Sequence, residues 1–369
     1  MNERRPAQFH RLGPVLYPAG LAMQRAMAER VMAGDPDQIL VLEHDAVYTL
    51  GRNATPADIH VNASFLQEAG IEVHRVDRGG QVTYHGPGQV VVYPICDLRR
   101  GGLDVGRFVH GLEEAMIRTA LGFGVKAERM PGRPGIWVGD QKLGALGIHL
   151  RRWVSTHGLA FNVAPDLGPF GWITPCGMAD KGVCSLRSLL GEDCPSWDHA
   201  ADRLVANLVD VLHLEHRPVP VPTQSVSATT WRRGPAGPEV LIMLRQPEDG
   251  LWWSSVTGMV EPGESLQEAA IREVLEETGL VGRLAPLDFS HSFFIDPQSL
   301  GLLGGEAHFN RETCFQVEVS RDSVLDLNLE EHSTCRWCSL EEALELVRWD
   351  GAKKAIRLLE RFLSGGPGQ

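Results

Sequence analysis

The sequence has no long apolar run, and this absence limits where the protein can reside. No stretch approaches the roughly 18–20 consecutive apolar residues that a membrane-spanning helix needs. The N-terminal stretch, MNERRPAQFHRLG, carries basic side chains with no apolar segment behind them, unlike a secretory signal peptide. We therefore expect a cytoplasmic protein with no membrane association.

Cysteine is also scarce, with seven residues at irregular spacing in a chain of 369. An odd number in so long a chain argues against a disulfide framework. Cys335 and Cys338 form the one C-x-x-C motif, but neither a thioredoxin-like context nor two further zinc ligands accompany it. The alternating pattern of TCRWCS favours a strand instead.

Basic residues are too few for a general nucleic-acid binder. The formal net charge is −12. Residues 1–216 hold 21 basic and 24 acidic side chains, whereas residues 217–369 hold 14 and 23. The strongly acidic charge of the C-terminal part argues against a nucleic-acid partner for that part, whereas the nearly balanced N-terminal part leaves a local basic patch open.

The length of the chain and one proline-rich segment predict two domains. A chain of this length exceeds most single compact cores. In RPVPVPTQ, prolines at alternate positions favour an extended connector. We expect a first domain at 1–216, a linker at 217–224 and a second domain at 225–369. A helical pattern ends the first domain near residue 216, and helical and strand-like patterns alternate before it, which predicts an α/β (α+β) fold.

The segment GMVEPGESLQEAAIREVLEETGL, residues 258–280, concentrates acidic side chains on one predicted helix over about 265–278. Glu273, Glu276 and Glu277 stand at i, i+3 and i+4, so a helix places all three carboxylates on one face. Clustered carboxylates repel one another unless a cation joins them, and hard oxygen ligands suit Mg²⁺ or Mn²⁺. Gly279 is well placed to end the helix.

This segment resembles the signature of the Nudix hydrolases at every constrained position: Gly258, Glu264, Arg272, Glu273, Val274, Glu276, Glu277, Gly279 and Leu280. The resemblance implies an α/β/α sandwich in which Glu273, Glu276 and Glu277 hold the metal and a small-molecule diphosphate is hydrolysed. The flanking segments LRQPEDGLWWSSVTG, HFNRETCFQVEV and EEHSTCRWCSLEEAL are most similar to dihydroneopterin triphosphate pyrophosphatases.

That similarity makes Glu331 a candidate additional metal ligand or general base, and we expect Glu276 and Glu331 to be catalytic. Trp252 and Trp253 are candidates for stacking on a base or pterin, or for a buried core. A solvated acidic helix face and a binding-only Nudix module are the alternatives to hydrolysis.

Three blocks of the N-terminal part combine glycine, lysine and cysteine: RGGQVTYHGPGQVVVYP, GDQKLGALGIHLRRWVSTHGLAFNV and ITPCGMADKGVCSL. The first is a glycine-rich loop that runs into a strand, and it lacks the spacing of a P-loop or of G-x-G-x-x-G. The second places Lys142 among small residues. In the third, Cys176 lies between proline and glycine in a predicted turn. An ammonium near such a cysteine would favour the thiolate.

Together these blocks are similar to the octanoyltransferase family over about residues 10–215. The resemblance implies a fold like that of biotin and lipoate protein ligases. It implies transfer of an octanoyl group from acyl carrier protein to a lysine on its protein acceptors, which are lipoyl domains of 2-oxo acid dehydrogenase complexes and the glycine-cleavage carrier protein. This domain would need neither metal nor nucleotide.

The resemblance also assigns roles to residues. Cys176 would form an octanoyl thioester, and Lys142 would lower the pKa of its thiol and later accept a proton from the acceptor lysine. His85 and His149 would support the site or be structural. The acyl and acceptor-lysine tunnel would be lined by Arg78, Gly79, Gly80, Gln81, Val82, Thr83, Tyr84, His85, Ala145, Leu146, Gly147, Gly158, Leu159 and Ala160. Alternatives are an ATP-dependent lipoate or biotin ligase and a non-catalytic binder of lipoyl domains.

Overall fold

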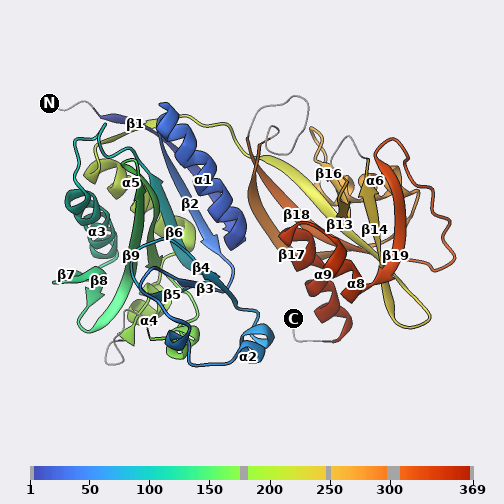
Figure 1. The fold of residues 1–369 in the computed structure, drawn as a ribbon, viewed down its shortest axis with the longest axis horizontal. Coiled ribbons are helices and arrows are strands. Elements are labelled where there is room, and N and C mark those ends of the chain that lie inside the picture. Colours follow the sequence, from blue (N-terminus) through green and yellow to red (C-terminus); the bar gives the residue numbers. More distant parts are fainter. Residues whose placement is uncertain (1–3, 175–181, 247–250, 297–307, 366–369) are drawn as a thin grey trace. The chain divides into compact units, whose positions relative to one another are not determined.

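The structure is a computed structural model that describes residues 4–174, 182–246, 251–296 and 308–365 (Figure 1). The chain separates into two compact units, Met1–Val219 and Pro220–Gln369. The proline-rich segment lies between strands β12 (Leu214–Arg217) and β13 (Thr223–Arg233). Among the described residues, no helix is long and apolar enough to cross a bilayer.

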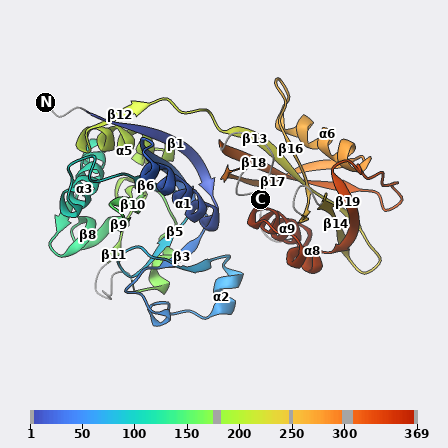
Figure 2. The same ribbon diagram turned by 45° about the horizontal axis from the view of Figure 1, so that its top comes forward.

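A large mixed sheet organises the first unit. Its strand order is β12, β1, β2, β6, β10, β9, β8, β7, with β11 paired to β9. Figure 2 shows β12 beside β1 at one edge of this sheet. The strand-like patterns of the first domain, at 39–43, 90–94, 136–138, 146–149 and 158–163, coincide with β2, β6, β8, β9 and β10. Besides β12, the strands of this sheet are β1 (Arg5–Val15), β2 (Asp37–His44), β6 (Gln89–Ile95), β7 (Glu128–Met130), β8 (Arg133–Val138), β9 (Gln141–Arg151), β10 (Val154–Asn162) and β11 (Gly182–Val183).

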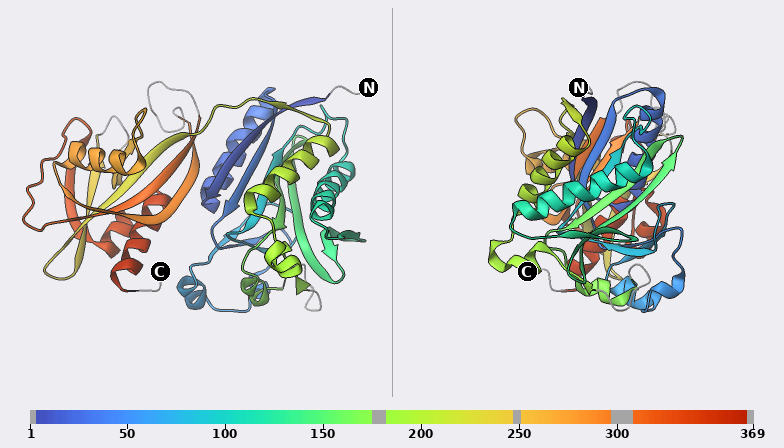
Figure 3. Two further views of the ribbon diagram at one scale, coloured as in Figure 1. Left: turned by 180° about the vertical axis from the view of Figure 1, so that it is seen from behind. Right: turned by 90° about the vertical axis from the view of Figure 1, so that its left-hand side faces the viewer.

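Helices cover this sheet on two faces (Figure 3). The helices α3 (Val105–Gly122) and α5 (Trp197–Val211) pack together over the face that carries Ile39 and Val41. Because strand side chains alternate, Leu40 and Leu42 face the other way, where α1 (Tyr17–Ala33) contacts β2, β6 and β10.

The helix predicted to run to about residue 216 ends earlier than expected. It stops at Val211, and His213 has a φ of 52°. A positive φ redirects the chain, and β12 then pairs in parallel with β1. The last residues of the predicted helix are therefore a strand, because the edge of the sheet offers them hydrogen bonds.

A smaller sheet carries the glycine-rich loop. Its strands are β4 (Glu72–Arg75), β3 (Val47–Leu50) and β5 (Val82–His85), in that order. Tyr48 and Tyr84 pack in its core, against Phe170 of a 3₁₀ turn over Gly168–Trp172. The unit also contains the short helices α2 (Ala63–Glu68) and α4 (Leu186–Leu190).

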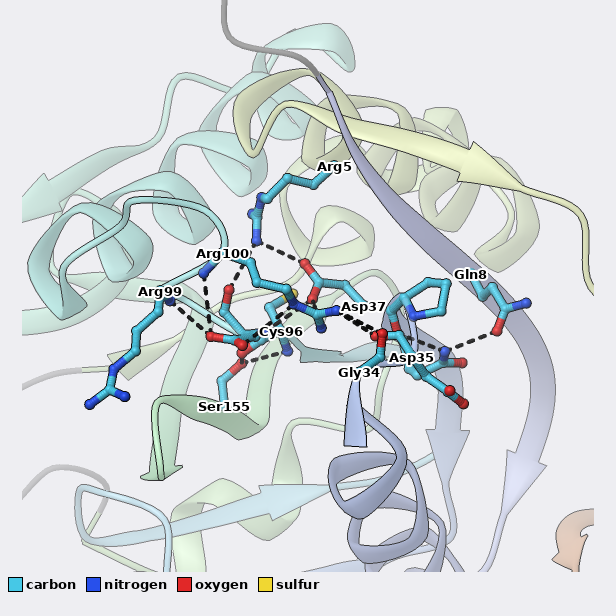
Figure 4. Close-up of polar contacts among 12 residues, drawn as sticks. Arg5, Gln8, Gly34, Asp35, Asp37, Cys96, Arg99, Arg100 and Ser155 are labelled. Atoms are coloured by element: carbon cyan, nitrogen blue, oxygen red, sulfur yellow. Dashed lines mark hydrogen bonds and ion pairs between the residues drawn. The ribbon is translucent and has the colours of Figure 1, made fainter. Parts of the chain in front are cut away.

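An ionic network around the buried Asp37 joins β1, β2 and the segment that follows β6 (Figure 4). Asp37 accepts hydrogen bonds from Arg5 Nη1 at 2.8 Å, from Arg100 Nη2 at 3.2 Å and from the Asp97 amide at 3.0 Å. Burial raises the pKa of the Asp37 carboxyl, and the two arginines oppose that shift. The network fixes the relative positions of three strands from distant parts of the sequence.

The second unit is a sheet between two helical layers. Its described residues form a seven-stranded mixed sheet with the path β15, β14, β13, β18, β17, in which β16 pairs with β13 and β19 with β14. Besides β13, the strands and helices of this unit are β14 (Pro238–Arg245), β15 (Trp253–Ser254), β16 (Val256–Met259), α6 (Leu266–Thr278), β17 (Gly282–Ile295), β18 (His308–Val319), β19 (His332–Ser339), α8 (Leu340–Leu346) and α9 (Asp350–Leu363).

Alternation along β18 assigns each helix to a face. Phe315 and Val317 pack in the clusters that contain residues of α6. Glu312 and Cys314 face the opposite way, toward the side where α9 contacts β13, β17 and β18. The predicted α/β/α sandwich is confirmed, and Cys335 and Cys338 lie in a strand as expected.

Candidate active sites

One cavity in the first unit brings together almost all of the residues predicted to line the tunnel. Its walls include 78–83 and His85 from the glycine-rich loop and β5, 145–147 from β9, and 158–160 from β10. Tyr84 does not line this cavity. Its side chain is 3% exposed and packs in the core of the small sheet, because it points to the opposite face of β5 from its neighbours.

Close backbone packing explains why glycines line this cavity. A Cβ on Gly147 would stand 3.0 Å from the Gly79 carbonyl oxygen and 3.2 Å from Arg78 Cδ. A Cβ on Gly158 would collide with the Val92 carbonyl oxygen. Any larger side chain at either position would displace a strand or the loop, so the slot stays narrow only with glycine.

Arg78 anchors the glycine-rich loop to the small sheet. Its side chain is 8% exposed, and it donates to the Thr49 carbonyl oxygen at 2.6 Å and to Thr49 Oγ1 at 2.7 Å. The same guanidinium donates to the Gly79 carbonyl oxygen at 3.0 Å. Arg78 therefore shapes the cavity by holding its own loop in place.

A chain of polar side chains runs along one wall of the cavity. His85 Nδ1 donates to Gln89 Oε1 at 2.7 Å, and Gln89 Nε2 donates to Asn162 Oδ1 at 2.9 Å. Asn162 Nδ2 in turn donates to the Cys184 carbonyl oxygen at 3.0 Å. Burial lowers the pKa of His85 to about 3, so its ring is uncharged at neutral pH.

A second buried histidine supports the same wall. His44 Nδ1 donates to the Val15 carbonyl oxygen and His44 Nε2 accepts from the Tyr93 hydroxyl, both at 2.7 Å. Burial lowers its pKa to about 4. Tyr93 lines the cavity, so the orientation of its hydroxyl is set by a neutral imidazole.

His157 combines an unusual backbone with a carboxylate partner. Its φ is 56° within β10, and its amide donates to Gln24 Oε1 at 2.6 Å. Its Nε2 lies 2.8 Å from Asp77 Oδ1, and His149 Nδ1 lies 2.9 Å from Asp77 Oδ2. Because His157 lines the cavity, this carboxylate holds one ring at the cavity wall and links His149 to it.

Lys142 lies on the cavity wall, on β9, with its Nζ 4.6 Å from the centre of the Trp137 ring. The strand β11 runs beside it: Val183 pairs with Lys142, and the Cys184 amide donates to the Lys142 carbonyl oxygen at 3.0 Å. Cys176 lies outside the described residues, so its predicted role as nucleophile stays a prediction. The described chain resumes directly beside Lys142.

In the second unit, the acidic helix is α6, and local sequence defines both of its ends. Ser265 caps the N-terminus and forms a capping box with Glu268. Gly279 ends the helix with a φ of 66°, a conformation that glycine adopts without strain. These signals place the helix within one residue of the predicted 265–278.

Arg272 gathers two of the three predicted metal ligands. Its Nη1 lies 2.8 Å from Glu273 Oε1 and 3.1 Å from Glu276 Oε2, and its Nε lies 2.9 Å from Glu264 Oε1. Glu273 also packs directly against Gly258, where a Cβ would collide with its carboxyl group. The glycine that precedes the helix therefore leaves the space that Glu273 occupies.

Glu277 turns away from the other two and joins a separate group. It is 1% exposed, and His332 Nε2 donates to its Oε2 at 2.8 Å. Potential ligand atoms of Glu277, Glu331 and His332 lie within 4.8 Å of one another. Glu331 also accepts from Arg245 Nη1 at 2.7 Å. The structure thus brings the predicted Glu331 to the helix.

The carboxylates have the chemistry that a hard divalent cation requires, although Glu277 lies with Glu331 and His332 while Glu273 and Glu276 lie with Arg272. Burial raises the pKa of both Glu273 and Glu277, while Arg272 and His332 respectively oppose the shift. A bound cation would favour the ionised carboxylates in the same way, and oxygen ligands are those that Mg²⁺ and Mn²⁺ prefer.

Comparison with known proteins supports this two-part description. The family model of the lipoyl protein ligase A/B catalytic domain matches residues 17–209, and that of the NUDIX domain matches residues 223–362. An octanoyltransferase of Myxococcus xanthus is 37% identical over 360 residues, which cover 94% of this chain and 97% of the relative. The chain belongs to the octanoyltransferase family. It also carries a Nudix domain, and the alignment with this relative spans both units.

Two solved structures add to this comparison. A lipoate-protein ligase A bound with ATP is 18% identical, with a TM-score of 0.50, and the match covers 58% of this chain and 88% of that one. It shows the ligase-like fold alone, as predicted. The E. coli dihydroneopterin triphosphate pyrophosphohydrolase is 24% identical over 40% of this chain and 100% of its own, with a TM-score of 0.31.

In this member of the octanoyltransferase family, several residues that line the cavity were not predicted from the sequence. They are Tyr17, Gln89, Tyr93, His157, Asn162, Phe170 and Val183. Gln89 ends the HGPGQ motif, and His157 and Asn162 flank GLAF, so the motifs themselves contained the signal for three of them. In the Nudix domain, His332 was missed although it follows Glu331 directly.

Proposed function

We propose that the first unit transfers an octanoyl group from acyl carrier protein to a lysine of its protein acceptors, lipoyl domains of 2-oxo acid dehydrogenase complexes and the glycine-cleavage carrier protein. The observation that supports this most is the cavity itself. Its walls are small or apolar at 145–147 and 158–160, and Lys142 lies among them. A narrow apolar slot suits a straight acyl chain.

The proposed reaction has two steps. The Cys176 thiolate attacks the carbonyl carbon of the octanoyl thioester, forming an enzyme thioester and releasing the thiol of the carrier. The amine of the acceptor lysine then attacks the enzyme thioester, forming an amide and releasing the Cys176 thiolate. Lys142 favours the Cys176 thiolate by its charge and gives a proton to the departing carrier sulfur. Lys142 is then neutral, so it can accept the proton that the attacking amine loses.

Mass spectrometry tests the first step directly. Mixing the protein with octanoyl-acyl carrier protein, without ATP, should add one octanoyl group, located on Cys176. Cys184→Ser is the matched control. Cys184 is 1% exposed and burial raises the pKa of its thiol to about 11, so it should be unreactive. Octanoyl transfer that requires ATP and leaves Cys176 unmodified would instead identify a ligase.

We propose that the second unit hydrolyses a nucleoside-diphosphate-linked or triphosphate substrate, with Mg²⁺ or Mn²⁺ held by Glu273, Glu276 and Glu277. The bound cation would neutralise phosphate charge and make a water molecule more acidic. Glu276 and Glu331 are the proposed catalytic carboxylates. One would accept the proton of the water that attacks phosphorus, while the bridging oxygen leaves with the departing phosphate group.

His332 and Arg272 position the three carboxylates that are proposed to hold the cation. His332 holds Glu277, and Arg272 holds Glu273 and Glu276. A screen of diphosphate compounds with Mg²⁺, comparing wild type with Glu276→Gln, tests the activity. Glu330→Gln is a suitable control because Glu330 is exposed and neighbours Glu331. Equal turnover in the wild type and in Glu276→Gln would contradict the assignment.

The two proposed sites use different residues and should be independent. Cys176→Ser should abolish octanoyl transfer and leave phosphohydrolysis unchanged, whereas Glu276→Gln should do the reverse. Loss of both activities in either variant, with the protein still folded, would show that the sites are coupled.

A further inference from the structure

Three potential metal ligands gather in the Nudix domain away from the α6 glutamates. They are His291 on β17 and Glu312 and Cys314 on β18, and their ligand atoms lie within 4.8 Å of one another. Neither proposed activity uses them.

Strand pairing explains why these side chains meet. His291 and Glu312 are directly opposite each other in the antiparallel pair of β17 and β18. Cys314 lies two residues along β18 from Glu312, so it shares that face of the sheet. This is the α9 side, opposite the face against which α6 packs. The group is therefore separate from the α6 glutamates by a full layer of sheet.

The group is enclosed. The side chain of His291 is 7% exposed, that of Glu312 is 13% exposed, and Cys314 is 1% exposed. The His291 ring stacks on Phe289 with their centres 5.1 Å apart. Gly351 of α9 covers the ring, and a Cβ there would collide with His291 Nε2.

The polar atoms of this group are incompletely paired. His291 Nε2 lies 3.2 Å from Glu312 Oε1. His291 Nδ1 is buried and has no hydrogen-bond partner among the described residues. A nearly buried carboxylate beside one imidazole is costly unless further positive charge compensates it.

We propose that His291, Glu312 and Cys314 bind a divalent cation of the zinc class, which ties β17 to β18 beneath α9. One sulfur, one nitrogen and one carboxylate oxygen form a donor set suited to Zn²⁺, whereas Mg²⁺ prefers oxygen alone. On binding, the Cys314 thiol releases its proton to solvent as the metal–sulfur bond forms, and His291 binds through an unprotonated ring nitrogen.

Cobalt substitution of the full-length protein tests the proposal. Co²⁺ bound to a thiolate gives a near-ultraviolet charge-transfer absorption that carboxylate sites cannot give. Titration of the wild type should produce this absorption with one equivalent of Co²⁺, and Zn²⁺ should abolish it. Cys314→Ser should lose it. Cys338→Ser, which alters a buried cysteine of the same sheet, should keep it.

Two further measurements distinguish lost ligation from misfolding. In His291→Gln the Kd for Zn²⁺ should rise by more than about tenfold, with the near-ultraviolet circular dichroism retained. In wild type under mild urea, Zn²⁺ should protect Cys314 but not Cys338 from alkylation. A wild type without cobalt–thiolate absorption, absorption that persists in Cys314→Ser, or equal alkylation with and without Zn²⁺ would each overturn the proposal.

Discussion

Replacing Thr49 by valine should loosen the glycine-rich loop without altering any residue that lines the cavity. Thr49 is fully buried on β3, and valine preserves its shape and its backbone carbonyl. The change removes Oγ1, which accepts from Arg78 Nη2 at 2.7 Å and from Arg78 Nε at 3.2 Å. Hydrogen bonds to a charged group contribute about 1.5–3 kcal/mol, so we expect a loss of about 2 kcal/mol in local stability.

Hydrogen exchange followed by mass spectrometry measures this loss in the first unit alone. A decrease of about 2 kcal/mol corresponds to roughly 30-fold faster exchange in peptides from β3 and β5. Octanoyl transfer should fall by about ten- to a hundredfold, because small misplacements of a positioning loop are costly. Phosphohydrolysis by the second unit should be unchanged in the same sample.

Thr119→Val is the matched control. Thr119 is also fully buried, its Oγ1 donates to the Ala115 carbonyl oxygen at 2.7 Å, and Asn207 donates to it at 3.0 Å. It lies in α3 and does not line the cavity, so this variant should lose stability while transfer per folded molecule stays normal. The reasoning is wrong if Thr49→Val exchanges like wild type, or if Thr119→Val lowers transfer equally.

Three further predictions concern other parts of the chain. Gly258→Ala should abolish phosphohydrolysis but spare octanoyl transfer, because the added methyl group displaces Glu273; normal hydrolysis would contradict this. Below pH 6.5 the first unit should lose stability, measured as hydrogen exchange against pH, because unfolding lets His44 and His85 bind protons that their folded pKa values of about 4 and about 3 exclude. His44→Gln should flatten that dependence, and an unchanged slope would count against it. Asp37→Ala should lower the stability of the first unit by about 3 kcal/mol in denaturant-dependent exchange, since it leaves the mostly buried Arg5 without its carboxylate, whereas Arg100 keeps Asp97; a loss below about 1 kcal/mol would show that solvent replaces the Arg5–Asp37 pair.

Local sequence patterns were sufficient for much of the fold. The apolar spacing located the main strands of the large sheet, and the start and stop signals of α6 located that helix to within one residue. The ligase-like and Nudix folds predicted from the motifs are confirmed. The pattern failed where a partner strand decided the outcome, as in β12, which was expected to be helical.

For the sites, periodicity indicated which face a side chain occupies but not which partner it meets. The spacing of Glu273, Glu276 and Glu277 placed them on one helical face, yet the structure directs Glu277 to His332, which is 55 residues away in the chain. Tyr84 belonged to a recognised motif, but alternation along β5 directs it into a core.

The sequence by itself determined the periodic and motif-based features of this protein, namely the acidic helix and the glycine-rich loop. These depend on contacts between near neighbours, which the order of residues specifies. Only the tertiary structure decided that Arg78 is anchored by Thr49 and that His291 meets Glu312 and Cys314. Those contacts arise from the pairing of strands and packing of layers, which depend on the whole chain at once.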